Sequence, residues 1–244
     1  MDVSAKVVLL DIEGTTSSVS YVYDILFPYA RQNFAEFLNR RLQEEKVKAA
    51  CNQLAVDTGA AGLDEFNCSS ESELIHRIIK EANKLMDADV KATGLKELQG
   101  LIWAEGYEKG ELKSHVYEDV PGALKKWKES GLDIRIFSSG SVGAQKVFFK
   151  NTESGDLGKL FSAHYDTTTG PKREAESYLI ISKEAGMKPE EIIFLSDVVE
   201  ELDAAKQAGM KTVLVKRPGN KPVSNNHGHE EITSFEQLHL AIAV

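Results

Sequence analysis

The sequence has few cysteines and no long apolar run, and each of these absences excludes a class of protein. The 244 residues contain two cysteines, so a small disulfide scaffold is excluded and a structural zinc site is disfavoured. No apolar stretch approaches the roughly 18 residues of a membrane-spanning helix. The beginning of the chain does not resemble a signal peptide, because Lys6 precedes only four apolar residues before Asp11. We therefore expect a cytoplasmic protein, of a size that could also enter the nucleus.

An excess of positive charge is also lacking. Lysine and arginine number 29 against 38 aspartate and glutamate residues, which gives a net charge of −9. Such a charge repels nucleic acids and acidic membranes, so neither is an expected partner. It also repels phosphorylated metabolites at long range. An anion-binding site here would have to be local, built from a metal ion, backbone N–H groups and a few cations.

Several familiar motifs are missing as well. No strand precedes a G-x-G-x-x-G run or a phosphate loop that ends in Gly-Lys-Ser/Thr, so a nucleotide site is disfavoured. The G-x-S-x-G turn of serine hydrolases is absent. His227 and His229 lie in a loop rich in proline, asparagine and glycine, where we expect them to face solvent.

What the sequence does contain is an alternation of strands and helices at its two ends. Residues 6–11 (KVVLLD) form an apolar run without alternation, which is typical of a strand buried on both faces. After Val120, single helices separate successive strands, and this arrangement implies right-handed parallel crossovers. Strands are expected at 133–138, 192–196 and 212–216, and helices at 142–149, 175–185 and 200–208. The ends of the chain are therefore predicted to form an α/β fold, a doubly wound parallel sheet covered by helices.

The middle of the chain is predicted to be helical. No comparable strand occurs between about residues 20 and 113, and apolar residues recur there at helical spacing. Ser70 and Glu73 are spaced to form a capping box at the start of one helix. We therefore expect an α/β core of residues 1–18 plus 115–244, interrupted by an all-helical cap domain of residues 19–114.

Acidic residues follow two of the expected strands. Asp11 ends the first strand, and Asp197 follows the strand 192–196. The carboxyl ends of parallel strands meet at one edge of a sheet, where ligands bind. Neighbouring carboxylates repel unless a cation or proton lies between them, and Mg²⁺ suits carboxylates and phosphate. Any one of these acids could merely cap a turn, but Asp11, Asp197 and the nearby Glu13 together predict a site for one Mg²⁺ ion.

Hydroxyl groups and a lysine are expected near the same edge. Ser138 and Ser139 follow a second strand and open a helix, where hydroxyl and N–H groups bind phosphate oxygens; serine is also a common helix cap. Lys172 lies in a loop after the strand-like segment 162–166. Such a lysine is usually a solvated surface residue, but here it could counter the repulsion between a carboxylate nucleophile and a phosphate.

These residues together resemble the four motifs of the haloacid dehalogenase-like (HAD) phosphatases. The resemblance spans the whole chain, including a cap inserted after the first motif. Most of that superfamily has D-x-D in the first motif, whereas this sequence has Glu13 in place of the second aspartate. The string D-I-E-G-T-T at 11–16 is similar to one branch, the enolase-phosphatases or acireductone synthases. Other strings that resemble this branch are 24–29 (DILFPY), 98–100 (LQG), 176–178 (ESY) and 217–220 (RPGN).

The resemblance implies a Mg²⁺-dependent enzyme of methionine salvage. Its substrate would be 2,3-diketo-5-methylthiopentyl-1-phosphate, which is enolised and then dephosphorylated to the acireductone 1,2-dihydroxy-3-keto-5-methylthiopentene. By the same resemblance, Asp11 is the nucleophile that forms an aspartyl-phosphate and is also a metal ligand. Asp197 is the later metal ligand. Glu13 matches the acid/base position, and it or its backbone carbonyl matches a metal ligand.

The remaining roles also follow from the resemblance. Lys172 matches the motif lysine, with a part in catalysis and in substrate binding. Ser138 and Ser139 match contacts to phosphate or substrate, and Glu201 occupies the place of a second acid in the fourth motif. Two candidates stay open for the base that enolises the substrate: Glu13 and a residue of the cap.

Other functions are compatible with parts of this pattern. A HAD phosphatase for another small phosphorylated metabolite, such as a sugar phosphate or phosphoglycolate, would share the site but not the substrate. A dehalogenase would use the aspartate without a metal, which Glu13 and Asp197 disfavour. A receiver domain would be about half as long and would lack a cap. In the first two cases the partner is a small molecule, and nothing in the sequence requires more than a monomer.

Overall fold

In the computed structural model, which describes residues 1–90, 92–224 and 226–242, the chain divides into two compact units. The first unit contains Met1–Tyr21 and Lys113–Val244, and the second contains Val22–Leu112. The sequence predicted a core of 1–18 plus 115–244 and an insertion of 19–114. A π-helical turn, Tyr21–Leu26, begins at the residue where the first unit is interrupted.

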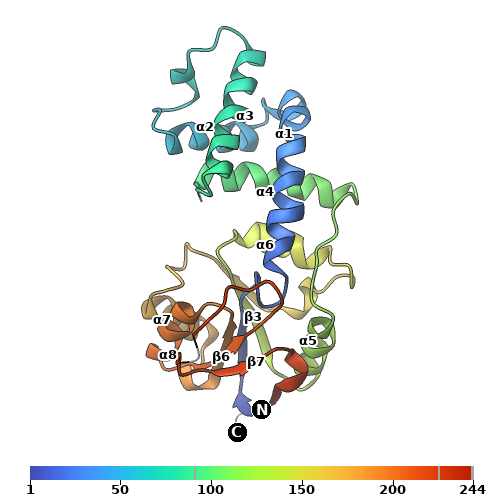
Figure 1. Ribbon diagram of the computed structural model, residues 1–244, viewed down its shortest axis with the longest axis vertical. Helices are drawn as coiled ribbons and strands as arrows, with labels where there is room; N and C mark the ends of the chain where they lie inside the picture. The colour runs from blue at the N-terminus through green and yellow to red at the C-terminus, as the bar shows by residue number, and fades with distance from the viewer. Residues whose placement is uncertain (91, 225, 243–244) are drawn as a thin grey trace. The chain divides into compact units, whose positions relative to one another are not determined.

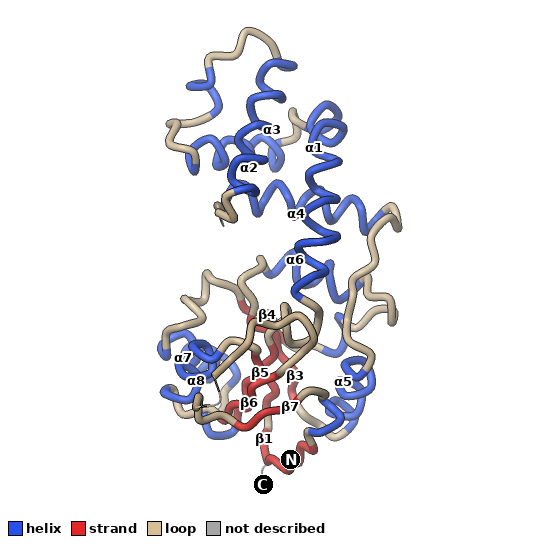
Figure 2. Tube along the Cα trace, in the orientation of Figure 1, coloured by secondary structure: helices blue, strands red, loops and turns tan. Residues whose placement is uncertain are grey.

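The first unit is built on a six-stranded parallel sheet, which confirms the predicted fold class (Figure 2). The strand order is β4-β3-β2-β5-β6-β7. The two central strands, β2 and β5, are buried at every position, which explains why their sequences are apolar without alternation. The strands are β2 (Val7–Leu10), β3 (Asp133–Phe137), β4 (Ala163–Tyr165), β5 (Ile192–Ser196), β6 (Lys211–Val215) and β7 (Glu230–Ile232).

Helices cover both faces of this sheet. The chain moves from β2 to β3 to β4 in one direction and from β5 to β6 in the other. Right-handed crossovers therefore place helices on opposite faces, and Figure 1 shows α7 and α8 on one side and α5 on the other. The direction reverses between β2 and β5, whose carboxyl ends form the switch point where ligands bind in such sheets. The helices are α5 (Asp119–Glu129), α6 (Val142–Lys150), α7 (Ala175–Ala185) and α8 (Val199–Gln207), with short 3₁₀ turns at Gly158–Leu160, Pro189–Glu191 and Phe235–Gln237.

Some features of the first unit were not predicted. Strand β1 (Asp2–Ala5) pairs in parallel with β8 (His239–Ile242) as a separate two-stranded sheet. The expectation that both loop histidines face solvent was wrong. The His229 ring lies between Thr212 Oγ1, at 2.8 Å, and Asp203 Oδ1, at 3.1 Å. The His229 side chain is fully buried. These two neighbours replace water as its hydrogen-bond partners and so offset the cost of burying a polar ring.

The second unit consists of helices packed around their own apolar core. Its elements are α1 (Phe27–Arg41), α2 (Glu45–Asp57), a 3₁₀ turn (Leu63–Phe66), α3 (Glu71–Asp87) and α4 (Thr93–Glu108). Helices α2 and α4 touch through Gly94, where a Cβ atom would lie 2.1 Å from the Leu54 nitrogen. Ser70 caps α3 as predicted, because its hydroxyl accepts from the Glu73 nitrogen. The Glu73 carboxylate accepts from the Ser69 nitrogen and not from the Ser70 nitrogen, so only half of the predicted capping box forms. Within the described part of the chain, no helix combines the length and apolar character needed to cross a bilayer.

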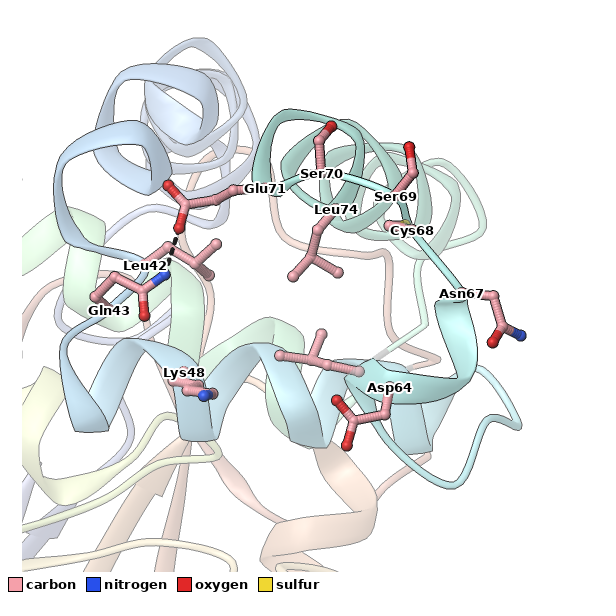
Figure 3. Close-up of a pocket in the computed structure, with 11 residues that line it drawn as sticks. Leu42, Gln43, Lys48, Asp64, Asn67, Cys68, Ser69, Ser70, Glu71 and Leu74 are labelled. Carbon is pink, nitrogen blue, oxygen red and sulfur yellow. Dashed lines mark hydrogen bonds between the residues drawn. The ribbon is translucent and has the colours of Figure 1, made fainter.

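This unit also contains a cavity of about 560 Å³ (Figure 3). Gln43 donates a hydrogen bond to Glu71 beside it. The predicted site residues, all within the described ranges, do not line this cavity. Its lining residues are Leu42, Gln43, Lys48, Leu63, Asp64, Asn67, Cys68, Ser69, Ser70, Glu71 and Leu74.

Candidate active site

Asp11 lies directly after β2, at the switch point of the sheet. Its nitrogen donates to the Leu195 carbonyl at 3.0 Å, so the backbone stays anchored to β5 for one residue beyond the strand. The residue is 3% exposed. Oδ1 accepts hydrogen bonds from the Ile12 nitrogen at 2.8 Å and from Lys172 Nζ at 2.8 Å. Oδ2 lies 3.2 Å from Ser196 Oγ, within hydrogen-bond distance. The carboxylate is thus held rigidly at the end of the strand.

Lys172 is a buried part of the site and not a surface residue. Its ammonium group lies 2.8 Å from Asp11 Oδ1 and 2.6 Å from Glu201 Oε2. Burial alone would lower the pKa of Lys172, but the charges of Asp11 and Glu201 outweigh this and raise it. Tyr178 donates from its hydroxyl to the Lys172 carbonyl at 2.7 Å, which ties the loop to α7. The lysine therefore carries a fixed positive charge beside Asp11.

Glu201, in the first turns of α8, shares the lysine with Asp11. Ser196 Oγ lies 3.1 Å from Glu201 Oε2 and 3.2 Å from Asp11 Oδ2, so its single proton serves one carboxylate at a time. Burial first, and the Asp11 charge second, raise the pKa of Glu201 to about 7. The sequence predicted the position of Ser196 at the end of β5 but not its role between the two carboxylates.

Glu13 and Ser138 meet across the site from two different strand ends. Ser138 Oγ donates to Glu13 Oε2 at 3.2 Å, and Ser138 itself is fully buried. Burial and the neighbouring Asp11 charge raise the pKa of Glu13, so this carboxyl group holds a proton more readily than an exposed glutamate. Ser139 is half-buried and follows Ser138. Helix α6 is capped by Ser141, which accepts from the Ala144 nitrogen, so capping does not account for the two earlier serines.

Asp197 follows β5 and lies against the loop after Asp11. Gly14 in that loop has a φ of +75°, and a Cβ atom there would lie 2.3 Å from Asp197 Oδ2. Both the backbone angle and the contact therefore require glycine. Burial, and then the Asp11 charge, raise the pKa of Asp197 to about 7. The structure thus brings Asp11, Glu13, Lys172 and Asp197 into one cluster in which acids outnumber the lysine.

The residues around Asp197 fit the Mg²⁺ ion that the sequence predicts. The groups that could bind the ion are oxygens, namely the carboxylates of Asp11 and Asp197. The amide oxygen of Asn220, which also lies close to Gly14, is buried without a hydrogen-bond partner. Hard oxygen donors and excess negative charge suit Mg²⁺. No three His, Cys, Asp or Glu side chains among the described residues are already grouped for a metal. An ion would therefore complete its shell with backbone oxygens and water.

Comparisons with known proteins show that the chain is similar to hydrolases over most of its length. The model of the family described as haloacid dehalogenase-like hydrolase matches residues 5–209. Enolase-phosphatase E1 of Drosophila mojavensis is 46% identical over 229 residues, which are 93% of this chain and 91% of that protein. Enolase-phosphatase E1 of Pseudomonas aeruginosa, strain LESB58, is 45% identical over 233 residues, 96% and 97% of the two chains.

A solved structure shows the same fold. The UTR4 protein of Saccharomyces cerevisiae matches with a TM-score of 0.78 and 33% identity, covering 96% of this chain and 100% of that one. The family model spans most of the chain, and the curated relatives match it over more than nine-tenths of its length. The chain belongs to the haloacid dehalogenase-like hydrolases and, within them, to the enolase-phosphatase E1 family.

Proposed function

We propose that the chain is a bifunctional, Mg²⁺-dependent enolase-phosphatase of methionine salvage. It converts 2,3-diketo-5-methylthiopentyl-1-phosphate to the acireductone 1,2-dihydroxy-3-keto-5-methylthiopentene and phosphate. The observation that carries this proposal is the pairing of Asp11 with the buried Lys172 at the switch point of the sheet, in a chain whose relatives are named enolase-phosphatases.

Asp11 is the proposed nucleophile. Its carboxylate attacks the phosphorus, the ester P–O bond breaks, and an aspartyl-phosphate forms; water then cleaves this intermediate and restores the carboxylate. Lys172, fixed 2.8 Å from Asp11 Oδ1, offsets the charge that gathers when a dianionic phosphate approaches an anionic side chain. Ser138 and Ser139 are proposed to contact the phosphate or another part of the substrate.

Glu13 is the proposed general acid and base. Burial and the Asp11 charge raise its pKa, which favours the protonated form that would donate to the departing enolate oxygen. The resulting carboxylate would then remove a proton from the water that cleaves the aspartyl-phosphate. Before substrate binds, the Ser138 hydroxyl, 3.2 Å away, donates to this carboxyl group and orients it.

One Mg²⁺ ion, held by Asp11, Asp197 and an oxygen of Glu13, would supply positive charge to the transferring phosphoryl group. Burial, and then the charges of Asp11 and Glu201, raise the pKa of Asp197, and a bound cation would offset these effects. The first unit is therefore the proposed catalytic core, and the helical unit Val22–Leu112 the proposed cap domain.

The proposed setting is that of a cytoplasmic monomer. Cys51 and Cys68 carry free thiols, and so small a number of cysteines is typical of a protein in a reducing compartment. Size-exclusion chromatography with light scattering tests the monomer, and a mass corresponding to two chains would contradict it. Cell fractionation distinguishes the cytoplasm from the nucleus.

Phosphate release tests the proposed reaction. The purified chain is assayed with Mg²⁺ or with EDTA, on the diketo-phosphate and on common phosphate esters, while ultraviolet absorbance follows the enol. Release that needs Mg²⁺, prefers the diketo-phosphate and passes through an enol signal is expected. Equal release from ordinary esters without an enol would instead indicate a phosphatase for another small metabolite. Full activity in EDTA would contradict the metal-dependent mechanism.

A further inference from the structure

Asn220 presents a buried acceptor to the predicted metal site. Its Oδ1 atom is shielded from solvent and has no hydrogen-bond partner. The residue lies in the loop after β6, and its backbone nitrogen donates to the Arg217 carbonyl at 3.1 Å. A buried polar atom without a partner is uncommon in native structures and indicates a missing water or ion.

The orientation of this amide follows from its neighbours. Asn220 Nδ2 donates to the Gly14 carbonyl at 2.9 Å and to the Val215 carbonyl at 3.2 Å. Only the amide nitrogen can face two carbonyl oxygens, because the oxygen has no proton to donate. Exchanging the two atoms would place three acceptors together. Oδ1 must therefore point to the opposite side.

On that side lies Asp197. The position of a Cβ atom on Gly14 would be 2.3 Å from Asp197 Oδ2 and 3.0 Å from Asn220 Oδ1, so both oxygens converge on the space that Gly14 leaves open. A carboxylate oxygen and an amide oxygen that lie close together repel, unless a cation or a donor lies between them. Thr15, the residue after Gly14, also has a buried hydroxyl group without a hydrogen-bond partner, and polar groups of this kind suit a bound water.

We propose that Asn220 is an additional residue of the Mg²⁺ site, and that its Oδ1 accepts a hydrogen bond from a water molecule in the hydration shell of the ion. This rests on the proposed function, which supplies the ion. Mg²⁺ dehydrates reluctantly and keeps several waters, and protein groups that bind such waters fix the ion and tune its affinity. The Nδ2 group meanwhile ties the Gly14 loop to the end of β6, so one side chain aligns both.

Mg²⁺ affinity of the metal-free full chain, measured by isothermal titration calorimetry without substrate, tests this proposal. Asn220→Ala removes both the acceptor and the donor, and we expect Mg²⁺ to bind about 10- to 100-fold more weakly. Asn220→Asp also removes the donor but keeps an oxygen and adds negative charge. It should bind Mg²⁺ at least as tightly as the unaltered chain.

The comparison of these two variants separates ligand binding from loop anchoring. Both lose the contacts to the Gly14 and Val215 carbonyls, so a purely anchoring role predicts that Asn220→Asp binds no better than Asn220→Ala. That result would overturn the proposal, as would unchanged affinity in Asn220→Ala. Urea unfolding of each variant shows that a folded chain was titrated.

Two further variants complete the experiment. Asn151→Ala, a matched truncation that loses one bond to the Val147 carbonyl at the end of α6, should leave Mg²⁺ affinity unchanged. Asp197→Asn should weaken it severely. If Asp197→Asn loses affinity and Asn220→Ala does not, the inference about Asn220 fails while the proposed function stands. If the unaltered chain does not bind Mg²⁺, the result contradicts the Mg²⁺ dependence of the proposed function.

Discussion

Replacing Lys172 with methionine should destabilise the metal-free protein strongly. Methionine has a similar length and no charge, so the packing beside Phe137 is largely kept. The hydrogen bond from Tyr178 to the backbone carbonyl of residue 172 does not involve the side chain. The substitution removes the cation that touches Asp11 at 2.8 Å and Glu201 at 2.6 Å. These two buried carboxylates then face each other without compensation.

The size of the effect follows from those two contacts. At an effective dielectric constant of about 20, unit charges at such distances attract by about 6 kcal/mol per pair. The cost of burying the ammonium group cancels several kcal/mol of this attraction, and removing one partner from a buried ion pair typically costs about 3–5 kcal/mol. We expect a loss of this size in the free energy of unfolding at pH 8 in EDTA.

The loss should shrink as the pH decreases. Unfolded carboxyl groups release their protons near pH 4, whereas the pKa of Asp197 and of Glu201 is raised to about 7 in the folded protein. Removing Lys172 raises both further. As the pH rises above 4, the unfolded state therefore releases protons first, and the free energy of unfolding decreases. At pH 4–5 Asp197 and Glu201 of the variant are protonated, and much of the deficit disappears.

Urea denaturation at pH 8 and at pH 5, in EDTA, measures this directly. Lys183→Met is the control, because Lys183 is an exposed lysine on α7 and its removal should change stability by less than about 0.5 kcal/mol. A deficit below about 1 kcal/mol for Lys172→Met at pH 8 would refute the reasoning. So would a deficit that does not depend on pH, since a loss of packing alone would behave in that way.

Four further predictions concern single side chains. Asp11→Asn should reduce phosphate release by more than about 10³-fold in steady-state assays while circular dichroism stays unchanged, because an amide is a poor nucleophile. Glu13→Gln should accumulate the aspartyl-phosphate, visible as a mass increase of the intact protein; normal turnover without it would assign the proton transfer to another group. Gly14→Ala should weaken Mg²⁺ binding in calorimetry, since the added Cβ would lie 2.3 Å from Asp197 Oδ2. Burial, and then Lys146, lower the pKa of His164 to about 4. The free energy of unfolding should therefore decrease as the pH falls from 6.5 to 4, because the unfolded chain takes up the proton first. In urea titrations, His164→Gln should make this decrease smaller by on the order of 1 kcal/mol, given the partial exposure of the ring.

The parts of the fold that were predicted are those with a local signal. Strand β5 is an apolar run, and α7 ends at Gly186, whose φ of +66° suits glycine. Strands β1, β7 and β8 carry no such signal. Exposed residues such as Glu230 and His239 fill their outward positions, and the pairing of β1 with β8 joins the two ends of the chain. Short edge strands of this kind depend on distant partners, so periodicity does not reveal them.

The residues of the candidate site also differ in how far the sequence predicts them. Asp11 and Asp197 were predictable because parallel strands must end at the same edge of the sheet, whichever residues lie between them. Lys172 could be placed near this edge from the strand-like segment before it, but a solvated surface lysine was the usual alternative, since its position depends on a loop that Tyr178 holds through the lysine's own carbonyl. Asn220 was visible as part of a string but had no assignable role, because its chemistry depends on which atom of its amide faces Gly14. Which residues gather at the site is thus a matter of topology, whereas what each one can do depends on hydrogen bonds that only the folded chain forms.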